Sequence, residues 1–225
     1  MKKHVLSLIP AVALRLFLTS CGGAVPSSSG ASGKTSAVST LSVAPANTAT
    51  AIFAGGCFWC MEKPFDQTAG VISTTSGYTG GTTDNPTYQQ VGRGGTGHIE
   101  AIKVVYDPAR VSYAQLLNIY WPEVDPFDGD GQFCDQGETY SPVIFVANDA
   151  EQIAAAASKQ TIEARFPGQT IAVRIMPAKT FWDAEGYHQD YDLKNPVRYA
   201  YYRNGCGRDS RLKRVWGAKP VASEK

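Results

Sequence analysis

Two cysteines separated by two aromatic residues follow a glycine pair in the first third of the chain. The segment from Ala51 to Asp66 reads AIFAGGCFWCMEKPFD, and Cys57 and Cys60 enclose Phe58 and Trp59. A short apolar strand, two glycines and a cysteine in the first turn of a helix favour a thiolate, because free N–H groups and the helix dipole stabilise its charge. This arrangement predicts a nucleophile at Cys57. The bulky residues between the cysteines indicate a pocket wall as much as a turn.

Other interpretations of these cysteines predict different chemistry. Cys57 and Cys60 could be small core residues or form a local structural bridge, but neither role needs a Gly-Gly entry to the helix. A zinc site needs four ligands, and the chain has no second close Cys or His pair. The segment 125–138, DPFDGDGQFCDQGE, has the composition of a calcium loop but no register with the required ligands. We therefore predict no metal site.

A glutamate lies on the segment of the chain that is most strand-like. In HIEAIKVVY, residues 98–106, Glu100 shares a face with Ile102 and Val104. If that face is buried, the pKa of the carboxyl is raised, and the group stays protonated near neutral pH as a general acid. The alternatives are a glutamate paired with an arginine, or one at a strand end that faces water.

The remaining elements must position these groups. We expect strands at 51–54, 71–77, 98–106, 142–147 and 170–176. We expect helices from Cys57, with a kink or end at Pro64, after Ser112, which forms a capping box with Gln115, and at 149–166. Residues 77–97 and 122–140 read as long loops, and the chain is irregular from 180. This order lacks a regular βαβ rhythm and predicts an α+β fold, a single domain with one mixed or antiparallel sheet and packed helices.

Composition is that of an ordinary globular domain. The chain has 225 residues, a formal net charge of +1, 43% hydrophobic and 18% charged residues. That charge gives no reason to expect a nucleic acid as partner. We expect a monomer with a hydrophobic core that needs no disulfide to hold it together.

The N-terminal segment predicts export. Residues 1–21 have lysines at positions 2 and 3 and continue with an apolar stretch that Pro10 and Arg15 interrupt. The end of this stretch, LTSCG, resembles a bacterial lipoprotein processing site, which places lipid on Cys21 and the protein on a membrane facing the periplasm or the cell exterior. A plain secretory signal is the alternative. Residues 22–50 then form a disordered tether of small residues, residues 51–211 the domain, and residues 212–225 a basic tail.

Several short motifs in order resemble the A-type peptide methionine sulfoxide reductases. They are GGCFWCMEKPFD, GYTGG, NPTY, GHIEA, VYDP, CDQGETYSPVIF and HQDYDLKNP, and they span about 51–211. The resemblance implies an α+β sandwich and thiol-dependent reduction of the S epimer of methionine sulfoxide, in proteins and as the free amino acid. It implies no bound cofactor, with reducing equivalents from a thioredoxin-like dithiol donor and oxidised proteins as substrates.

The resemblance also assigns roles around the reacting sulfur. Cys57 is implied as the nucleophile that attacks the sulfoxide sulfur and becomes a sulfenic acid. Phe58 and Trp59 are implied as the apolar wall that receives the substrate methyl group.

On the oxygen side, Glu100 is implied as the acid that protonates the sulfoxide. Tyr88 and Tyr140 are implied as hydroxyls that polarise the oxygen, and Asp135 as the carboxylate that helps to organise it. Where many relatives have NHDP and NDHG, this chain has EVDP (123–126) and CDQG (134–137).

The resolving thiol is the least defined part of the site. Cys206 is flanked by two glycines in RNGCGRD, so we expect it to swing in and form a disulfide with Cys57 first. Cys60 or Cys134 would take the bond over in a second exchange. We expect the rigid helix to hold the sulfurs of Cys57 and Cys60 poorly for bond formation.

Two other classes of function remain open. A thioredoxin-like dithiol oxidoreductase would use Cys57 and Cys60 but leave Glu100 and the two tyrosines without a role. A non-catalytic lipoprotein that binds a partner would not depend on Cys57.

Overall fold

The computed structural model describes residues 47–217. The chain divides into two units, residues 1–42 and residues 43–225, and every described residue belongs to the second. The predicted signal segment, the lipid site at Cys21 and most of the predicted tether lie outside the described residues, as does the chain beyond residue 217.

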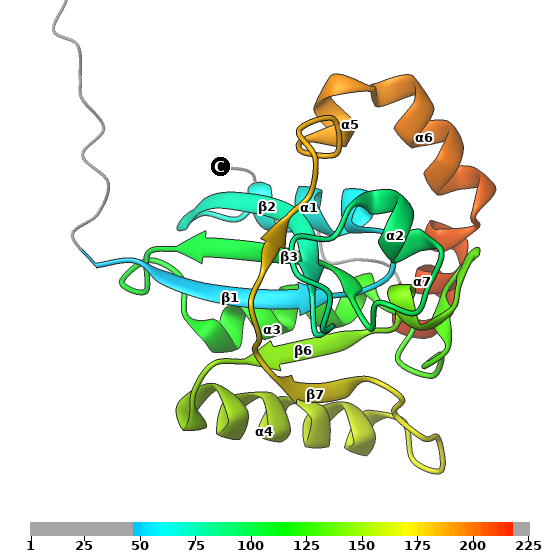
Figure 1. The fold of residues 1–225 in the computed structure, drawn as a ribbon. Coiled ribbons are helices and arrows are strands. Elements are labelled where there is room, and N and C mark those ends of the chain that lie inside the picture. Colours follow the sequence, from blue (N-terminus) through cyan, green and yellow to red (C-terminus); the bar gives the residue numbers. More distant parts are fainter. Residues whose placement is uncertain (1–46, 218–225) are drawn as a thin grey trace, which may run out of the picture. The chain divides into compact units, whose positions relative to one another are not determined.

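One six-stranded mixed sheet forms the centre of the fold (Figure 1). Its strand order is β7-β6-β1-β3-β2-β8, with every neighbouring pair antiparallel except β6 and β7. The strands are β1 (Ala49–Ala54), β2 (Val71–Thr79), β3 (Ile99–Tyr106), β6 (Val143–Val146), β7 (Arg174–Pro177) and β8 (Trp182–Asp183). The sheet confirms the predicted α+β class and four of the predicted strands, while β7 begins four residues later than expected.

Seven α-helices surround this sheet within the described residues. They are α1 (Phe58–Asp66), α2 (Tyr88–Gly92), α3 (Tyr113–Tyr120), α4 (Asp149–Arg165), α5 (Tyr191–Lys194), α6 (Pro196–Gly205) and α7 (Arg208–Trp216). Two 3₁₀ turns, Trp121–Glu123 and Glu138–Tyr140, and a small ribbon of β4 (Gly131–Gln132) and β5 (Asp135–Gln136) complete the described elements. The capping box predicted at Ser112 is present at the start of α3.

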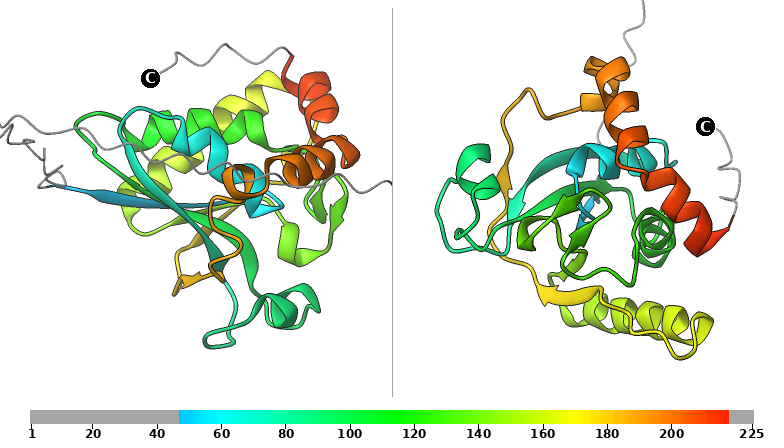
Figure 2. Two further views of the ribbon diagram at one scale, coloured as in Figure 1. Left: turned by 90° about the horizontal axis from the view of Figure 1, so that it is seen from above. Right: turned by 90° about the vertical axis from the view of Figure 1, so that its right-hand side faces the viewer.

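The two faces of the sheet carry separate apolar clusters. On β1, Phe53 belongs to the larger cluster, which packs against α1, α3 and α4, and Ala54 belongs to a smaller one on the other face. This alternation is the two-residue period of a strand. Figure 2 shows α1, α3 and α4 on one side of the sheet, and α2 on the opposite side.

Two regions predicted to be irregular contain helices. The predicted loop 77–97 contains the end of β2 and the helix α2, whose start is a capping box between Thr87 and Gln90. The region after residue 180 contains α5, α6 and α7. Helix α7 crosses the predicted domain end at residue 211, and Leu212 is buried, so residues 212–216 belong to the domain rather than to a tail.

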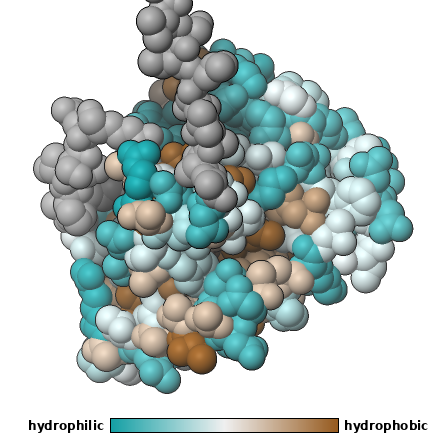
Figure 3. All heavy atoms as spheres, turned by 90° about the vertical axis from the view of Figure 1, so that its left-hand side faces the viewer, coloured by the Kyte–Doolittle hydropathy of each residue, from teal (hydrophilic) through white to brown (hydrophobic). Residues whose placement is uncertain are grey.

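The surface is mixed in character. On the face drawn in Figure 3, hydrophobic residues form small groups between hydrophilic ones wherever grey atoms do not cover them. Among residues 47–217, none of the helices combines the length and hydropathy that a membrane span requires.

Candidate active site

Cys57 is the N-cap residue of α1 and is separated from the end of β1 by Gly55 and Gly56. Both preceding glycines are required by close packing: a Cβ on Gly55 would lie 2.6 Å from Met61 Sδ, and one on Gly56 would lie 2.6 Å from Gln132 Cβ. Gly56 also has φ +79°, which favours glycine. The sharp strand-to-helix connection therefore places Cys57 at the positive end of α1, as the sequence predicts.

The sulfurs of Cys57 and Cys60 are hydrogen-bonded to each other, and both side chains are buried. Burial, together with the neighbouring Cys60, raises the pKa of the Cys57 thiol well above its usual value. The hydrogen bond from Cys57, with the guanidinium groups of Arg208 and Arg203, lowers the pKa of Cys60 to about 6. These shifts place the proton of the pair on Cys57 and the charge on Cys60, whereas the sequence predicts the thiolate at Cys57. Both cysteines are free, and the expectation that the helix holds their sulfurs poorly for bond formation stays a prediction.

Glu100 lies beside Cys57, on β3. Its side chain is 2% exposed and shares the buried face with Ile102 and Val104, which confirms the prediction from strand periodicity. The backbone N–H of Phe58 donates a hydrogen bond of 3.2 Å to Glu100 Oε2. Burial raises the pKa of the carboxyl to about 8, against the opposing effect of that hydrogen bond. A neutral carboxylic acid near pH 7 is thus present at the N-terminus of α1.

Two tyrosines and an aspartate, all half-buried, are close to the same groups. The hydroxyls of Tyr88 and Tyr140 are hydrogen-bonded to each other. Burial raises the pKa of Tyr88 to about 12, with further contributions from the charges of Glu100 and Cys57. Burial and the same charges also raise the pKa of Tyr140. Both tyrosines are therefore protonated donors at neutral pH, and burial raises the pKa of Asp135 from its usual range.

An aromatic wall forms around Phe58 and Trp59. Phe58 is buried with its ring 5.0 Å from that of His188, and Trp59 stacks on Tyr191 with ring centroids 3.7 Å apart. The indole N–H of Trp59 donates to His188 Nδ1 at 3.0 Å. Buried His188 Nε2 has no hydrogen-bond partner among the described residues. His188 and Tyr191 belong to the HQDYDLKNP motif, to which the sequence analysis gave no role.

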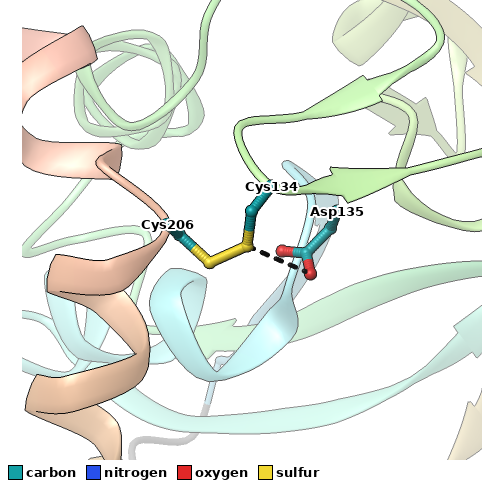
Figure 4. A group of neighbouring side chains, drawn as sticks. All are labelled: Cys134, Asp135 and Cys206. Atoms are coloured by element: carbon teal, nitrogen blue, oxygen red, sulfur yellow. Dashed lines mark hydrogen bonds between the residues drawn. A yellow bond between two sulfur atoms is a disulfide. The ribbon is translucent and has the colours of Figure 1, made fainter.

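The structure contains a disulfide between Cys134 and Cys206 (Figure 4). It differs from the pair expected to form first, Cys57 with Cys206, and corresponds to the pair expected after a second exchange. Cys134 Sγ lies 3.8 Å from Asp135 Oδ1, a contact rather than a hydrogen bond because a disulfide sulfur has no proton to donate. Cys206 is not on a free segment: it joins α6 to α7.

These three side chains are also the group within residues 47–217 that has metal-ligand character. The ligand atoms of Cys134, Asp135 and Cys206 lie within 4.8 Å of one another. The two sulfurs are bonded to each other, and Asp135 accepts a hydrogen bond from Tyr202. The donor set is therefore engaged in other bonds.

Tyr202 is a site residue that the sequence analysis missed. Its side chain is hydrogen-bonded to Cys57 and donates its O–H to Asp135 Oδ2, and its ring packs edge-on against Trp59 at 5.6 Å. Residues after 180 were expected to be irregular, so nothing in the sequence pointed to Tyr202, which lies on α6.

The departures from the usual family motif have partners in the C-terminal helices. Glu123 Oε2 lies 3.7 Å from Arg203 Nη2, and Asp125 Oδ2 lies 2.5 Å from Arg211 Nε. The segment 123–126 is thus tied to α6 and α7 by ion pairs.

Comparison with known proteins places this geometry in context. A sequence profile described as "Peptide methionine sulfoxide reductase" matches residues 49–220. The chain is 48% identical over 172 residues to "Peptide methionine sulfoxide reductase MsrA 2" of Rhizobium meliloti (strain 1021), covering 76% of this chain and 85% of that protein. It is 51% identical over 168 residues to "Peptide methionine sulfoxide reductase MsrA" of Ligilactobacillus salivarius (strain UCC118), covering 74% and 97%.

Solved structures give the same result. The structure titled "Methionine sulfoxide reductase A of Corynebacterium diphtheriae" has a TM-score of 0.62 and 34% identity, and the match covers 67% of this chain and 76% of that one. The reduced form of Mxr1 from Saccharomyces cerevisiae has a TM-score of 0.64 and 30% identity, with 71% and 92% covered.

Proposed function

This chain belongs to the peptide methionine sulfoxide reductase family, whose members reduce methionine sulfoxide, and from that premise we propose how its own residues carry out the reaction. Cys57 is the nucleophile and Glu100 the general acid. The observation that carries this proposal is a buried carboxyl with a raised pKa next to a cysteine at a helix N-terminus. The dithiol oxidoreductase and the binding module leave that carboxyl without a role.

The chemical step needs both groups at once. A sulfoxide is a poor electrophile until its oxygen gains a proton, which Glu100 supplies while the hydroxyls of Tyr88 and Tyr140 donate hydrogen bonds to the same oxygen. The Cys57 thiolate attacks the sulfur, the oxygen passes to Cys57, and methionine leaves. The products are methionine and a sulfenic acid on Cys57.

The pocket supports selection of the S epimer. Phe58 and Trp59, held by His188 and Tyr191, provide a wall for the methyl group, and Glu100 marks the oxygen side. Two substituents of a chiral sulfur are thereby fixed. The test is a single-turnover reaction of reduced enzyme with each epimer of methionine sulfoxide. Methionine from the S epimer is expected, and equal rates for both epimers would refute this pocket.

Regeneration requires a second thiol and an external reductant. We propose that Cys206 resolves the sulfenic acid and passes the bond to Cys134. The Cys134–Cys206 disulfide supports this order, because it is the bond that such an exchange would leave. Cys60 is the alternative first partner, favoured by its hydrogen bond to Cys57. A thioredoxin-like dithiol then reduces the outer disulfide, whose Cys134 is exposed while Cys57 and Cys60 are buried.

We also propose that the enzyme is exported and held on a membrane through lipid on Cys21, with oxidised proteins outside the cytoplasm as its substrates. The support is the basic and apolar character of residues 1–21 and the LTSCG segment.

A further inference from the structure

Tyr202 connects two groups of the site that come from distant parts of the chain. Its hydroxyl donates to Asp135 Oδ2, and the same side chain is hydrogen-bonded to Cys57. The ring is held edge-on against Trp59, so the position of the hydroxyl is fixed by packing as well as by its hydrogen bonds.

The Cys134–Cys206 disulfide joins α6 to the ribbon of β4 and β5, the same two parts of the fold that the Tyr202–Asp135 hydrogen bond joins. Cys206 follows Tyr202 by four residues at the end of α6, and Cys134 directly precedes Asp135. The Cys134–Cys206 bond and the Tyr202–Asp135 hydrogen bond therefore tie α6 to the ribbon of β4 and β5 side by side.

A tyrosine with two such partners has only one proton to donate. While that proton is donated to Asp135, the oxygen of Tyr202 accepts from the Cys57 S–H. When Cys57 is a thiolate, the Tyr202 hydroxyl instead donates its hydrogen bond to the sulfur. Asp135 then no longer accepts from Tyr202, because its carboxyl carries a proton. The chain of hydrogen bonds from Cys57 through Tyr202 to Asp135 can therefore carry one proton from the thiol to the carboxylate.

We propose that Tyr202 is a further catalytic residue whose hydroxyl passes the thiol proton of Cys57 to the carboxylate of Asp135 as the nucleophile forms. The proposal rests on the proposed role of Cys57. The S–H bond breaks, its proton moves to the tyrosine oxygen, and the tyrosine proton moves to Asp135. After one reduction, Asp135 holds the proton that Cys57 lost, and Glu100 lacks the one it gave to the oxygen, so atoms and charge balance.

The proposal explains how a buried thiol becomes reactive. Burial opposes the charged form of Cys57, and so do the charges of Cys60 and Glu100, whereas the hydrogen bond from Tyr202 favours it. The raised pKa of Asp135 makes that carboxylate a better proton acceptor than an exposed one. The titratable groups that act on Cys57 and on this path are Cys60, Tyr88, Glu100, Asp135, Tyr140, Tyr202 and the guanidinium of Arg208.

The test compares Tyr202→Phe with Tyr201→Phe. Phenylalanine keeps the ring that contacts Trp59 and removes only the hydroxyl, and Tyr201, on the same helix, is 84% exposed and serves as the matched control. Two rates are measured against pH in the full chain: donor-free methionine formation, and alkylation of Cys57 by iodoacetamide, located by mass spectrometry. The second rate reports the thiolate independently of sulfoxide reduction.

In Tyr202→Phe, both rates should fall about tenfold or more near neutral pH, and the midpoint of alkylation should move to higher pH. Asp135→Asn should have the same effect, and the double variant should be no slower than the slower single variant, because both lie on one path. Tyr201→Phe should match the wild-type enzyme in both rates. Asp135→Asn also reports on the path if Tyr202→Phe fails to fold.

Three results would overturn the proposal. One is a Tyr202→Phe enzyme with wild-type rates, and another is one with a slower rate but an unchanged alkylation midpoint, which indicates packing alone. The third is a midpoint that moves in Cys60→Ser and not in Tyr202→Phe, which makes Cys60 the proton acceptor. Failure of the wild-type enzyme to form methionine would instead refute the proposed function of the site.

Discussion

Burial has opposite consequences for the two central residues of this site. Burial keeps Glu100 protonated near neutral pH, as a general acid must be. Burial also makes the Cys57 thiol harder to ionise, although a nucleophile must be ionised to react. Cys60 adds to that second effect, while the helix N-terminus and the Tyr202 hydroxyl offset it. Strand periodicity was enough to predict Glu100. Tyr202 could not be predicted in this way, because its contact with Cys57 depends on how α6 packs rather than on any local pattern.

Replacing Glu100 by Gln tests the acid. The amide keeps the shape but has no proton to give, so we expect single-turnover reduction of methionine sulfoxide to slow by about a hundredfold or more. Substrate affinity should change little. Glu163→Gln, an exposed site on α4, is the control and should leave the rate unchanged. An unaltered rate in Glu100→Gln would return this residue to a structural role.

The pKa of Glu100 also predicts a dependence on pH. Its folded value of about 8 lies above the usual 4.5, so the folded state binds the proton more tightly than the unfolded state. The stability that this proton gives is present at low pH and is lost as pH rises from the unfolded value to about 8, by up to about 5 kcal/mol.

The rate should follow the same titration. Single-turnover reduction should decrease above about pH 8 as Glu100 loses its proton. Glu100→Gln should unfold at higher denaturant concentration than the wild-type enzyme at pH 9, a value chosen about one unit above that pKa. A wild-type rate that continues to rise through this range would contradict the protonated state of Glu100.

Helices and strands that are determined by neighbouring residues could be predicted from the sequence, whereas those that depend on tertiary contacts could not. The apolar runs of β1 and β3 and the capping box of α3 were predicted because neighbouring residues determine them. The helices α6 and α7 were missed, since their many polar and aromatic residues resemble an irregular chain until ion pairs such as Glu123–Arg203 and Asp125–Arg211 hold them in place. The missed helices bring Cys206 and Tyr202 to the site.

The number of methionine molecules formed per enzyme tests which of the thiols on these elements take part in the reaction. Reduced enzyme has four thiols in residues 47–217, namely Cys57, Cys60, Cys134 and Cys206, which correspond to two disulfides. Without a donor, it should form about two methionines per enzyme, since each disulfide accounts for one. Cys206→Ser should form about one and lose most of its turnover with a dithiol protein donor.

The Cys60→Ser variant gives the comparison. It should retain donor-driven turnover if Cys206 resolves the sulfenic acid. Full turnover in Cys206→Ser, with loss in Cys60→Ser, would assign the resolving role to Cys60.

At the scale of the whole molecule, the sequence combines an enzyme domain with a predicted export and lipidation segment. The match of the enzyme domain to its family runs across residues 49–220. The segment before it stays a prediction from residues 1–21, where the apolar stretch and Cys21 carry the signal.

Replacing Cys21 by Ser removes the atom that would carry lipid. We expect the full chain, expressed in a bacterium, to move from the membrane fraction to the soluble fraction and to lose incorporation of labelled palmitate. Sulfoxide reduction per enzyme should not change, because Cys21 lies outside the catalytic domain. Continued membrane association without label in both proteins would favour a plain secretory signal or another anchor.

The central claim is that Cys57 is the sulfur that takes the oxygen from methionine sulfoxide. The most direct measurement is methionine formed per enzyme in a donor-free reaction with reduced full-length protein, compared with Cys57→Ser. A hydroxyl cannot provide the thiolate, so the account predicts a burst of at least about one methionine per wild-type enzyme and none above the uncatalysed background in Cys57→Ser. A burst of wild-type size in Cys57→Ser would contradict the account.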